Sequence, residues 1–177
     1  MKKLLILFSF FLLFSLSCNE LDQFTMFDID FSESYNIPPI PVVNIPVEIP
    51  LPPVATHSDS LFQIYDTDIS LIEKATLREM RLIVNSPAEG NFKFLKSISF
   101  FLGAAGIPEK EAAWHYNVPE DALDTLQLET TYEDLSLFIV QDTLLITVSI
   151  LTDTTTSEEY KITAEMIFFV DAKILGL

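Results

Sequence analysis

The sequence predicts an all-β protein: a two-sheet antiparallel β-sandwich, immunoglobulin-like or Greek-key, with one or two short crossover helices. Apolar and polar residues alternate in segment after segment, which is typical of strands with one buried face. Polar turns separate these segments about every ten residues, as in folds made of two packed sheets. Apolar residues make up 49% of the 177 residues and glycine only four, so a large core is available.

The predicted strands follow from this alternation in chain order. In the first, Phe27, Ile29 and Phe31 alternate with two aspartates. The later strands are marked by apolar residues two positions apart: Met80, Leu82 and Val84; Ile98, Phe100 and Leu102; Ala112, Trp114, Tyr116 and Val118; Leu126 and Leu128; Leu144, Ile146, Val148 and Ile150; and the even positions from Tyr160 to Ile174. Ile167 and Phe169 add apolar residues to the other face of the last strand, so the strand is either covered on both faces there or bends, and we expect the bend.

Two short segments show helical spacing instead. In 131–140, apolar residues recur three and four positions apart behind Thr131, and Asp134 stands where a capping residue is expected. Ser70 and Glu73 have the same relation in 70–75. Both segments are expected to cross between sheets, which favours a Greek-key order over a simple meander.

The prolines are concentrated in one segment, 37–53. Composition alone would suggest a rigid linker in the polyproline conformation. From Ile45 to Pro53, however, apolar residues at odd positions alternate with Pro46, Glu48, Pro50 and Pro52. Residues of one parity point their main-chain groups to the same side of a strand, so the missing N–H donors fall on one edge. We therefore predict an edge strand that its prolines protect, preceded by an extended arm.

The N-terminus predicts export and lipid attachment. A basic start, an apolar run over Leu4–Leu16 and small residues after it form the pattern of a secretory signal peptide, 1–17. The run is too short for a membrane-spanning helix, which needs about 20 residues. Cys18, the single cysteine, follows directly. It is either a small residue near a signal-peptidase site or the thiol that receives lipid, and we expect the second. The lipidated tether is then 18–23.

The mature chain is expected to form a single domain over 24–177. Loss of the signal peptide removes two of the ten basic residues and none of the 26 acidic ones. So acidic a chain is not expected to bind nucleic acid or, by charge, an anionic membrane surface, because both need Lys and Arg. The excess predicts a solvated exterior, with calcium or a cationic ligand as the alternative.

No catalytic or cofactor-binding residue is nominated. His57 lies in a polar turn, and His115 has the parity opposite to the apolar residues of its strand, which predicts a solvent-facing side chain. Neither histidine has a metal-ligand spacing, and no nucleophile motif is present. The pairs Asp28 with Asp30 and Asp66 with Asp68 are the alternatives for calcium, but solvated carboxylates explain them more simply. We therefore expect no cofactor and no metal.

Trp114 and Tyr116 have two interpretations. They share parity with Ala112 and Val118, and an apolar strand face is usually core. They are therefore expected to be buried. The alternative is an exposed aromatic platform on which a sugar stacks.

The segment Val84–Leu102, "VNSPAEGNFKFLKSISFFL", and the following "IPEKEAAWHYNVP" resemble uncharacterised β-sandwich lipoproteins of Bacteroidota-type bacteria. Ser17 and Cys18 resemble the lipobox of bacterial lipoproteins, with Ser15 where that pattern usually has Leu. Glu20 and Asp22 resemble the signal that exports such lipoproteins to the cell surface. The resemblance implies attachment to the outer membrane, and it supplies no catalytic residues.

The function we expect is a non-enzymatic binding, adhesion or assembly role in the cell envelope. The chain would be attached to the membrane through lipid on Cys18 and would have an envelope protein or a glycan as its partner. The alternative is an accessory or weak hydrolase domain that uses surface carboxylates, with a carbohydrate as a possible substrate.

Overall fold

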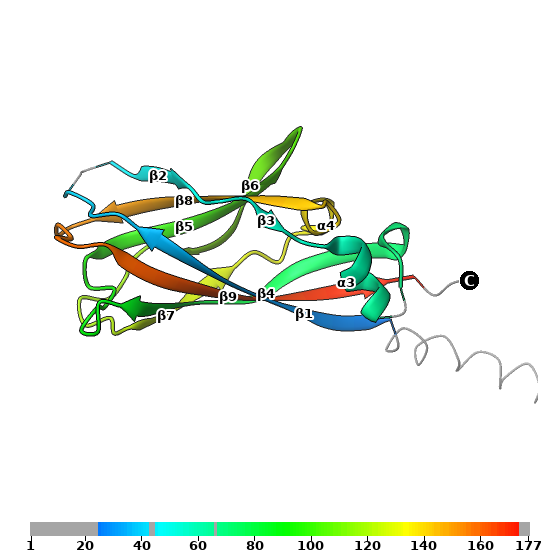
Figure 1. Ribbon diagram of the computed structural model, residues 1–177, viewed down its shortest axis with the longest axis horizontal. Coiled ribbons are helices and arrows are strands. Elements are labelled where there is room, and N and C mark those ends of the chain that lie inside the picture. The colour runs from blue at the N-terminus through cyan, green and yellow to red at the C-terminus, as the bar shows by residue number, and fades with distance from the viewer. Residues whose placement is uncertain (1–24, 43–44, 66, 174–177) are drawn as a thin grey trace, which may run out of the picture.

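The computed structural model describes residues 25–42, 45–65 and 67–173, and these form a mostly antiparallel β-structure (Figure 1). The prediction of an all-β fold is confirmed. The described elements in chain order are β1 (Met26–Ile37), β2 (Val47–Pro50), β3 (Val54–Ala55), α3 (Ser58–Ile64), the 3₁₀ turn η2 (Ile69–Leu71), β4 (Ile72–Ser86), β5 (Leu95–Ala104), β6 (Ile107–His115), β7 (Thr125–Thr130), α4 (Ser136–Ile139), β8 (Thr143–Thr152) and β9 (Tyr160–Ala172).

The strands form one hydrogen-bonded sheet in the order β1-β9-β4-β7-β6-β5-β8-β2, and β3 also pairs with β8. The short strand β7 makes the sheet continuous. Its residues Thr125–Leu128 pair with β4, and Glu129 and Thr130 pair with β6. The sheet curls around this strand, so two separate packed sheets, the finer part of the fold prediction, are not confirmed. The order is not a simple meander, because β4 lies beside β7 and β8 lies beside β5.

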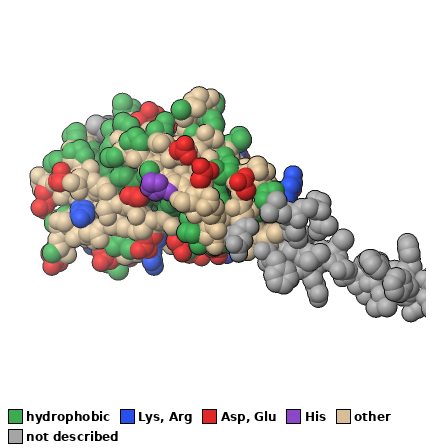
Figure 2. Space-filling view, turned by 45° about the vertical axis from the view of Figure 1, so that its right-hand side comes forward, with side chains coloured by type: hydrophobic (Ala, Val, Ile, Leu, Met, Phe, Trp, Pro, Cys, Tyr) green, Lys and Arg blue, Asp and Glu red, His purple; other side chains and the backbone are tan. Residues whose placement is uncertain are grey.

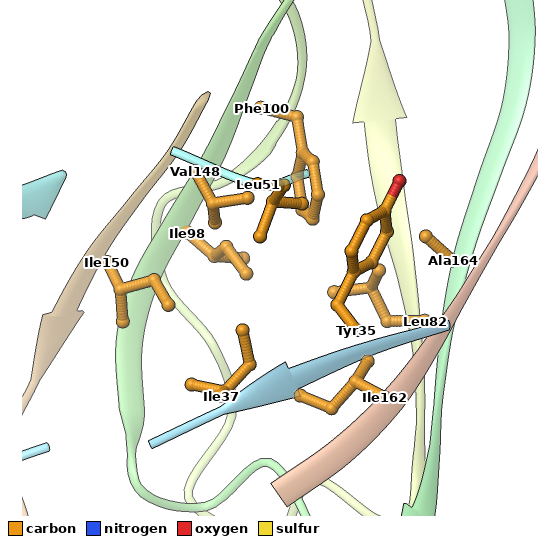
Figure 3. A pocket seen from close by; sticks show the side chains of 10 residues that line it. All are labelled: Tyr35, Ile37, Leu51, Leu82, Ile98, Phe100, Val148, Ile150, Ile162 and Ala164. Carbon is orange, nitrogen blue, oxygen red and sulfur yellow. The ribbon is translucent and has the colours of Figure 1, made fainter. Parts of the chain in front are cut away.

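The curl places the two halves of the sheet face to face around the core. Side chains from β1, β4 and β9 meet those of β5 and β8 at a small apolar pocket, to which one residue between β2 and β3 also contributes (Figure 3). The pocket is lined by Tyr35, Ile37, Leu51, Leu82, Ile98, Phe100, Val148, Ile150, Ile162 and Ala164. At one end of the molecule α3 contributes Phe62, which is fully buried. The alternation in the sequence thus becomes one continuous core.

The proline-rich segment lies along an edge of the sheet. Within the described residues β2 pairs with β8 alone, and the N–H of Leu51 continues this pairing by donating to the carbonyl of Ile146 at 2.9 Å. Odd residues therefore bond β8, while the main chain of the even residues, three of them proline, is directed outward. This is the arrangement that the parity of the prolines predicts. The arm before β2 is held by threonines of the β8–β9 loop: Ile40 donates its N–H to Thr156 Oγ1 at 2.7 Å.

Both predicted helices are present only as single turns. In each, an aspartate caps a serine two residues further on: Asp68 accepts from the N–H of Ser70, and Asp134 from the N–H of Ser136, both at 2.9 Å. The 3₁₀ turn η2 gives way to β4 at Ile72, so the predicted helix 70–75 is mostly strand. The helix predicted over 131–140 is reduced to Ser136–Ile139 because its first residues are held in turns by their own side chains.

The prediction of a bend in the last strand is wrong. β9 is one strand over Tyr160–Ala172, paired with β1 on one side and β4 on the other, and buried and half-buried residues alternate along it. Ile167 and Phe169 lie on its outer face. The guanidinium carbon of Arg78 lies 4.8 Å from the centre of the Phe169 ring, so a side chain of the neighbouring strand covers this apolar surface.

Candidate functional site

The candidate site is built on β6, which is paired on both sides and is therefore held rigidly. Its register with β5 contains an irregularity: Phe100 is opposite Ala113, but the next residue, Phe101, is opposite Glu111. Ala112 is thus an extra residue, a β-bulge. Ala112 and Ala113 are both fully buried, and their small side chains allow the strand to bend at this point.

A bulge shifts the alternation of a strand by one residue, and here it exchanges the faces of three side chains. His115 is opposite Ile98, a core residue, and its Nδ1 is buried with no hydrogen-bond partner among the described residues. Trp114 is opposite Ser99 on the outer face, where it is half-buried, and Tyr116 is 52% exposed. The predictions of a solvent-facing His115 and a buried Trp114 and Tyr116 are therefore wrong, because both assumed unbroken alternation.

The two rings on the outer face are held in a fixed arrangement. The rings of Trp114 and Tyr116 stack with centres 5.8 Å apart and planes inclined by 19°. The hydroxyl of Tyr116 donates to Oε2 of Glu111 at 2.8 Å. Desolvation and this contact with Glu111 raise the pKa of Tyr116. On the β7 side, Glu129 is opposite Trp114 in the sheet register.

A hollow of about 540 Å³ adjoins Trp114 where β7 leaves β4 and turns toward β6. Its lining combines aromatic, ionic and hydroxyl side chains: Arg78, Trp114, Leu128, Glu129, Thr130, Thr131 and Tyr132. The ring of Tyr132 is 87% exposed, and the hydroxyl of Thr130 donates to the carbonyl of Arg78 at 3.3 Å. We call the rings of Trp114 and Tyr116, their two glutamates and this hollow the aromatic site.

The charges of the aromatic site are of both signs but mainly negative. The guanidinium of Arg78 pairs with Asp28 at 2.7 Å, which fixes its position at the rim. Glu111, bonded to Tyr116, and Glu129, opposite Trp114 in the sheet register, provide carboxylate acceptors. On the face drawn in Figure 2, acidic side chains are spread widely, with few basic ones between them. The site can therefore stack a flat apolar group and hydrogen-bond polar groups around it, but it repels anions.

The predicted anchor lies outside the described part of the chain. The structure describes neither the predicted signal peptide, 1–17, nor the predicted tether, 18–23, so lipid attachment at Cys18 remains a prediction. Across 25–42, 45–65 and 67–173, no helix has the length and apolar character needed to cross a bilayer.

The described members of the acidic pairs considered for calcium, Asp28, Asp30 and Asp68, do not form a metal-ligand group with other described residues. Asp28 is paired with Arg78, and Asp68 caps η2, where hydrogen bonds from Ser70 lower its pKa. Asp66 lies outside the described residues. Among the residues that the structure describes, no three His, Cys, Asp or Glu side chains are grouped as a metal site would need. His57 is exposed at the start of α3, as its turn position suggested.

Sequence reasoning missed Arg78, Glu111, Glu129 and Tyr132 as parts of one site. These residues come from β4, β6, β7 and the loop before α4, and only the curl of the sheet brings them together. One local signal was present: Ala112 and Ala113 are two small residues in succession within a strand that otherwise carries large side chains.

Comparison with known proteins gives no family. No protein-family model matches the chain, and no curated protein matches it. Among solved structures, a chain from turnip yellow mosaic virus is similar with a TM-score of 0.29 and 8% identity over 85% of both chains. A chain from Desmodium yellow mottle tymovirus has a TM-score of 0.24 and 11% identity over 85% of this chain and 91% of that one. Similarity at such TM-scores carries no information about function.

Proposed function

We propose that the chain is a non-enzymatic binding protein of the bacterial cell envelope, attached to the outer membrane through lipid on Cys18. In this proposal the domain, a Greek-key β-sandwich in the broad sense, presents the aromatic site to a ligand outside the membrane. The chain would belong with the Bacteroidota-type lipoproteins that it resembles. The attachment rests on the N-terminal pattern, and the binding role rests on the site.

One observation carries the binding role: the bulge at Ala112 turns Trp114 and Tyr116 outward on an interior strand. Turning the rings outward leaves Trp114 half-buried and Tyr116 52% exposed. The fold thus loses part of the burial of two large side chains, and full burial of one such side chain contributes about 2 kcal/mol. A strand without the bulge would have kept that burial. Exposed rings fixed by a hydrogen bond and set beside a hollow are typical of surfaces that bind a ligand.

A second candidate function is an accessory or weak hydrolase domain. The presence of Glu111 on β6 and Glu129 opposite Trp114 on β7 favours it, because glycoside hydrolysis uses two carboxylates. We rank it second, since Glu111 already accepts a hydrogen bond from Tyr116, and the hollow itself is lined by a single carboxylate, Glu129. Turnover of a glycan that is lost in Glu129→Gln would place this candidate first.

The anchor is tested in the producing cell. Metabolic labelling with a palmitate analogue should mark the full chain, and fractionation should find it with the membranes. Cys18→Ala should lose both the label and the membrane association. If the label is equal in the two proteins, the anchor is not Cys18.

The binding role is tested with a soluble chain that begins at Asn19. This form keeps the entire described core, which extends from Ile29 to Ala172. It should sediment with purified envelope fragments, and Trp114→Ala should weaken this binding at least tenfold, while a thermal melt checks that the variant is still folded at the temperature of the assay. Ile64→Ala is the matched control, because it truncates an apolar side chain that is 76% exposed on α3. Equal binding by the wild type and Trp114→Ala would exclude the aromatic site as the binding surface.

A further inference from the structure

We infer that the ligand of the aromatic site is a neutral carbohydrate, a glycan of ring sugars with adjacent free hydroxyls. This inference rests on the proposed binding function and names the ligand class of the same site. It follows from three properties of the site: its rings, its polar groups and the ligands that it excludes.

The stacked pair offers a flat apolar surface that is already ordered. The Tyr116 ring lies against Trp114, and its hydroxyl is bonded to Glu111, so neither ring loses much freedom when a ligand binds. A pyranose ring has a face of C–H groups, weakly positive, that packs on the negative face of an aromatic ring. Its size matches one ring, and a chain of sugars can extend from Trp114 into the hollow toward Tyr132.

The polar groups of the site suit hydroxyls, which both donate and accept. Glu111 and Glu129 can only accept, whereas Arg78 can only donate. A carboxylate and a guanidinium each bind two adjacent hydroxyls in a forked geometry. The contact of Arg78 with Asp28 at 2.7 Å holds the guanidinium at the rim before any ligand arrives. The hydroxyls of Thr130 and Tyr132 add groups that can do either.

The same groups disfavour the other common ligands. Two carboxylates beside Trp114 repel phosphates and acidic glycans, and the formal net charge of the chain is −16. An extended peptide would bind best by adding a strand to a free edge. At Trp114 that route is closed, because β6 is paired there with β5 on one side and with β7 on the other. A ligand must therefore be recognised through side chains, as a glycan is.

The test uses the soluble chain from Asn19 and envelope fragments divided into three portions. Periodate cleaves the C–C bond between two carbons that bear adjacent free hydroxyls, oxidising them to aldehydes as it is reduced to iodate, and so opens sugar rings that carry such a pair, whereas a protease removes proteins. Mock treatment uses periodate that has been quenched beforehand. We expect periodate to reduce sedimentation of the chain at least tenfold relative to the mock portion, whether or not the protease has an effect.

Two variants examine the kind of contact at the ring. Trp114→Tyr keeps an aromatic face and should retain most of the binding, whereas Trp114→Leu keeps apolar volume without a flat ring and should weaken it at least tenfold. Thermal melts check that both variants fold.

The outcomes separate the two proposals. Binding that survives periodate but is lost after protease identifies a protein ligand, which overturns the carbohydrate inference and leaves the proposed function standing. Equal binding by Trp114→Leu and Trp114→Tyr also overturns it, because only bulk apolar contact is then used. Absence of binding to mock-treated fragments would overturn the proposed function, and the inference with it.

Discussion

The two edges of the curled sheet differ in how their main chain is protected. Residues 46–52, which include β2, direct four even positions outward, and three of these, Pro46, Pro50 and Pro52, have no N–H to donate. β1 also directs its even positions outward, from Met26 to Asn36, but none of them is proline. The first edge thus lacks three of its four outward N–H donors, whereas the second keeps all of them.

β1 is instead covered by packing at its N-terminal end. The ring of Tyr65, which follows α3, stacks on Phe27 with centres 4.2 Å apart, and its hydroxyl donates to the outward carbonyl of Asp28 at 2.9 Å. Phe27 also packs edge-on against the buried Phe62. Further along β1, the outward positions carry exposed polar side chains such as Asp30 and Ser32. The prolines protect an edge without contributing contacts, whereas Tyr65 protects an edge by contributing to stability.

The largest effect, self-association of the chain, is expected when the missing N–H donors of the proline-rich edge are restored. Replacing Pro46, Pro50 and Pro52 by threonine returns three N–H groups to one side of the edge and raises its strand propensity. The soluble chain should then change from a monomer to higher assemblies in light scattering at high concentration. Its urea midpoint should change little, because these prolines are exposed. Pro119→Thr, in the loop after β6, is the control and should remain monodisperse. A monodisperse triple variant would contradict this role for the prolines.

The next largest effect, a loss of stability, is expected at the edge formed by β1. Tyr65→Ala removes a ring stack and a hydrogen bond, each worth about 1 kcal/mol, so the free energy of unfolding should fall by about 2 kcal/mol in urea titrations. Tyr65→Phe keeps the stack and should lose about half of that. Neither variant is expected to associate, because the acidic and polar side chains of β1 remain. Association of Tyr65→Ala would show that both edges rely on the same kind of protection.

The edges also show what alternation in a sequence can and cannot predict. The parity of the prolines was sufficient to indicate an edge strand, because parity determines both the face of a side chain and the direction of its main chain. The strands from β4 to β9 were likewise predictable from alternation. The helix α3 was missed, although Ser58, Leu61, Phe62 and Tyr65 have helical spacing, because its neighbours read as a polar turn.

The candidate site was predictable only in part. Alternation identified Trp114 and Tyr116 but assigned them to the wrong face, since one extra residue at Ala112 reverses every later side chain. Such a bulge depends on register with β5, which is not visible within β6 itself. Arg78 and Tyr132 lie far from Trp114 along the chain, and their place beside it follows from the order of strands in the sheet.

The smallest effect on stability is expected in the apolar pocket where a side chain of β1 meets one from the residues after β2. Tyr35 of β1 projects into the apolar pocket that also contains Leu51 beside β2 (Figure 3). It is 7% exposed, and its hydroxyl has no hydrogen-bond partner among the described residues. Burying an unpaired hydroxyl opposes folding, so Tyr35→Phe should raise the free energy of unfolding at pH 7 by about 1 kcal/mol. Exposed Tyr132→Phe is the control and should leave the urea midpoint at pH 7 unchanged.

The prediction for Tyr35→Phe can also be tested by measuring stability at alkaline pH. Burial, and then the charge of Glu33, raise the pKa of Tyr35 from 10.0 to about 12 in the folded chain. Between these values the unfolded chain loses the phenol proton and the folded chain keeps it, so stability is intact below pH 10 and falls as pH rises toward 12. Tyr35→Phe lacks this contribution, so its advantage over the wild type should widen across that window in urea titrations. Two results would contradict this prediction: a stability difference between the two proteins that stays constant from pH 10 to 12, or a Tyr35→Phe variant that is less stable than the wild type at pH 7. Either would mean that the hydroxyl of Tyr35 is solvated or has a hydrogen-bond partner.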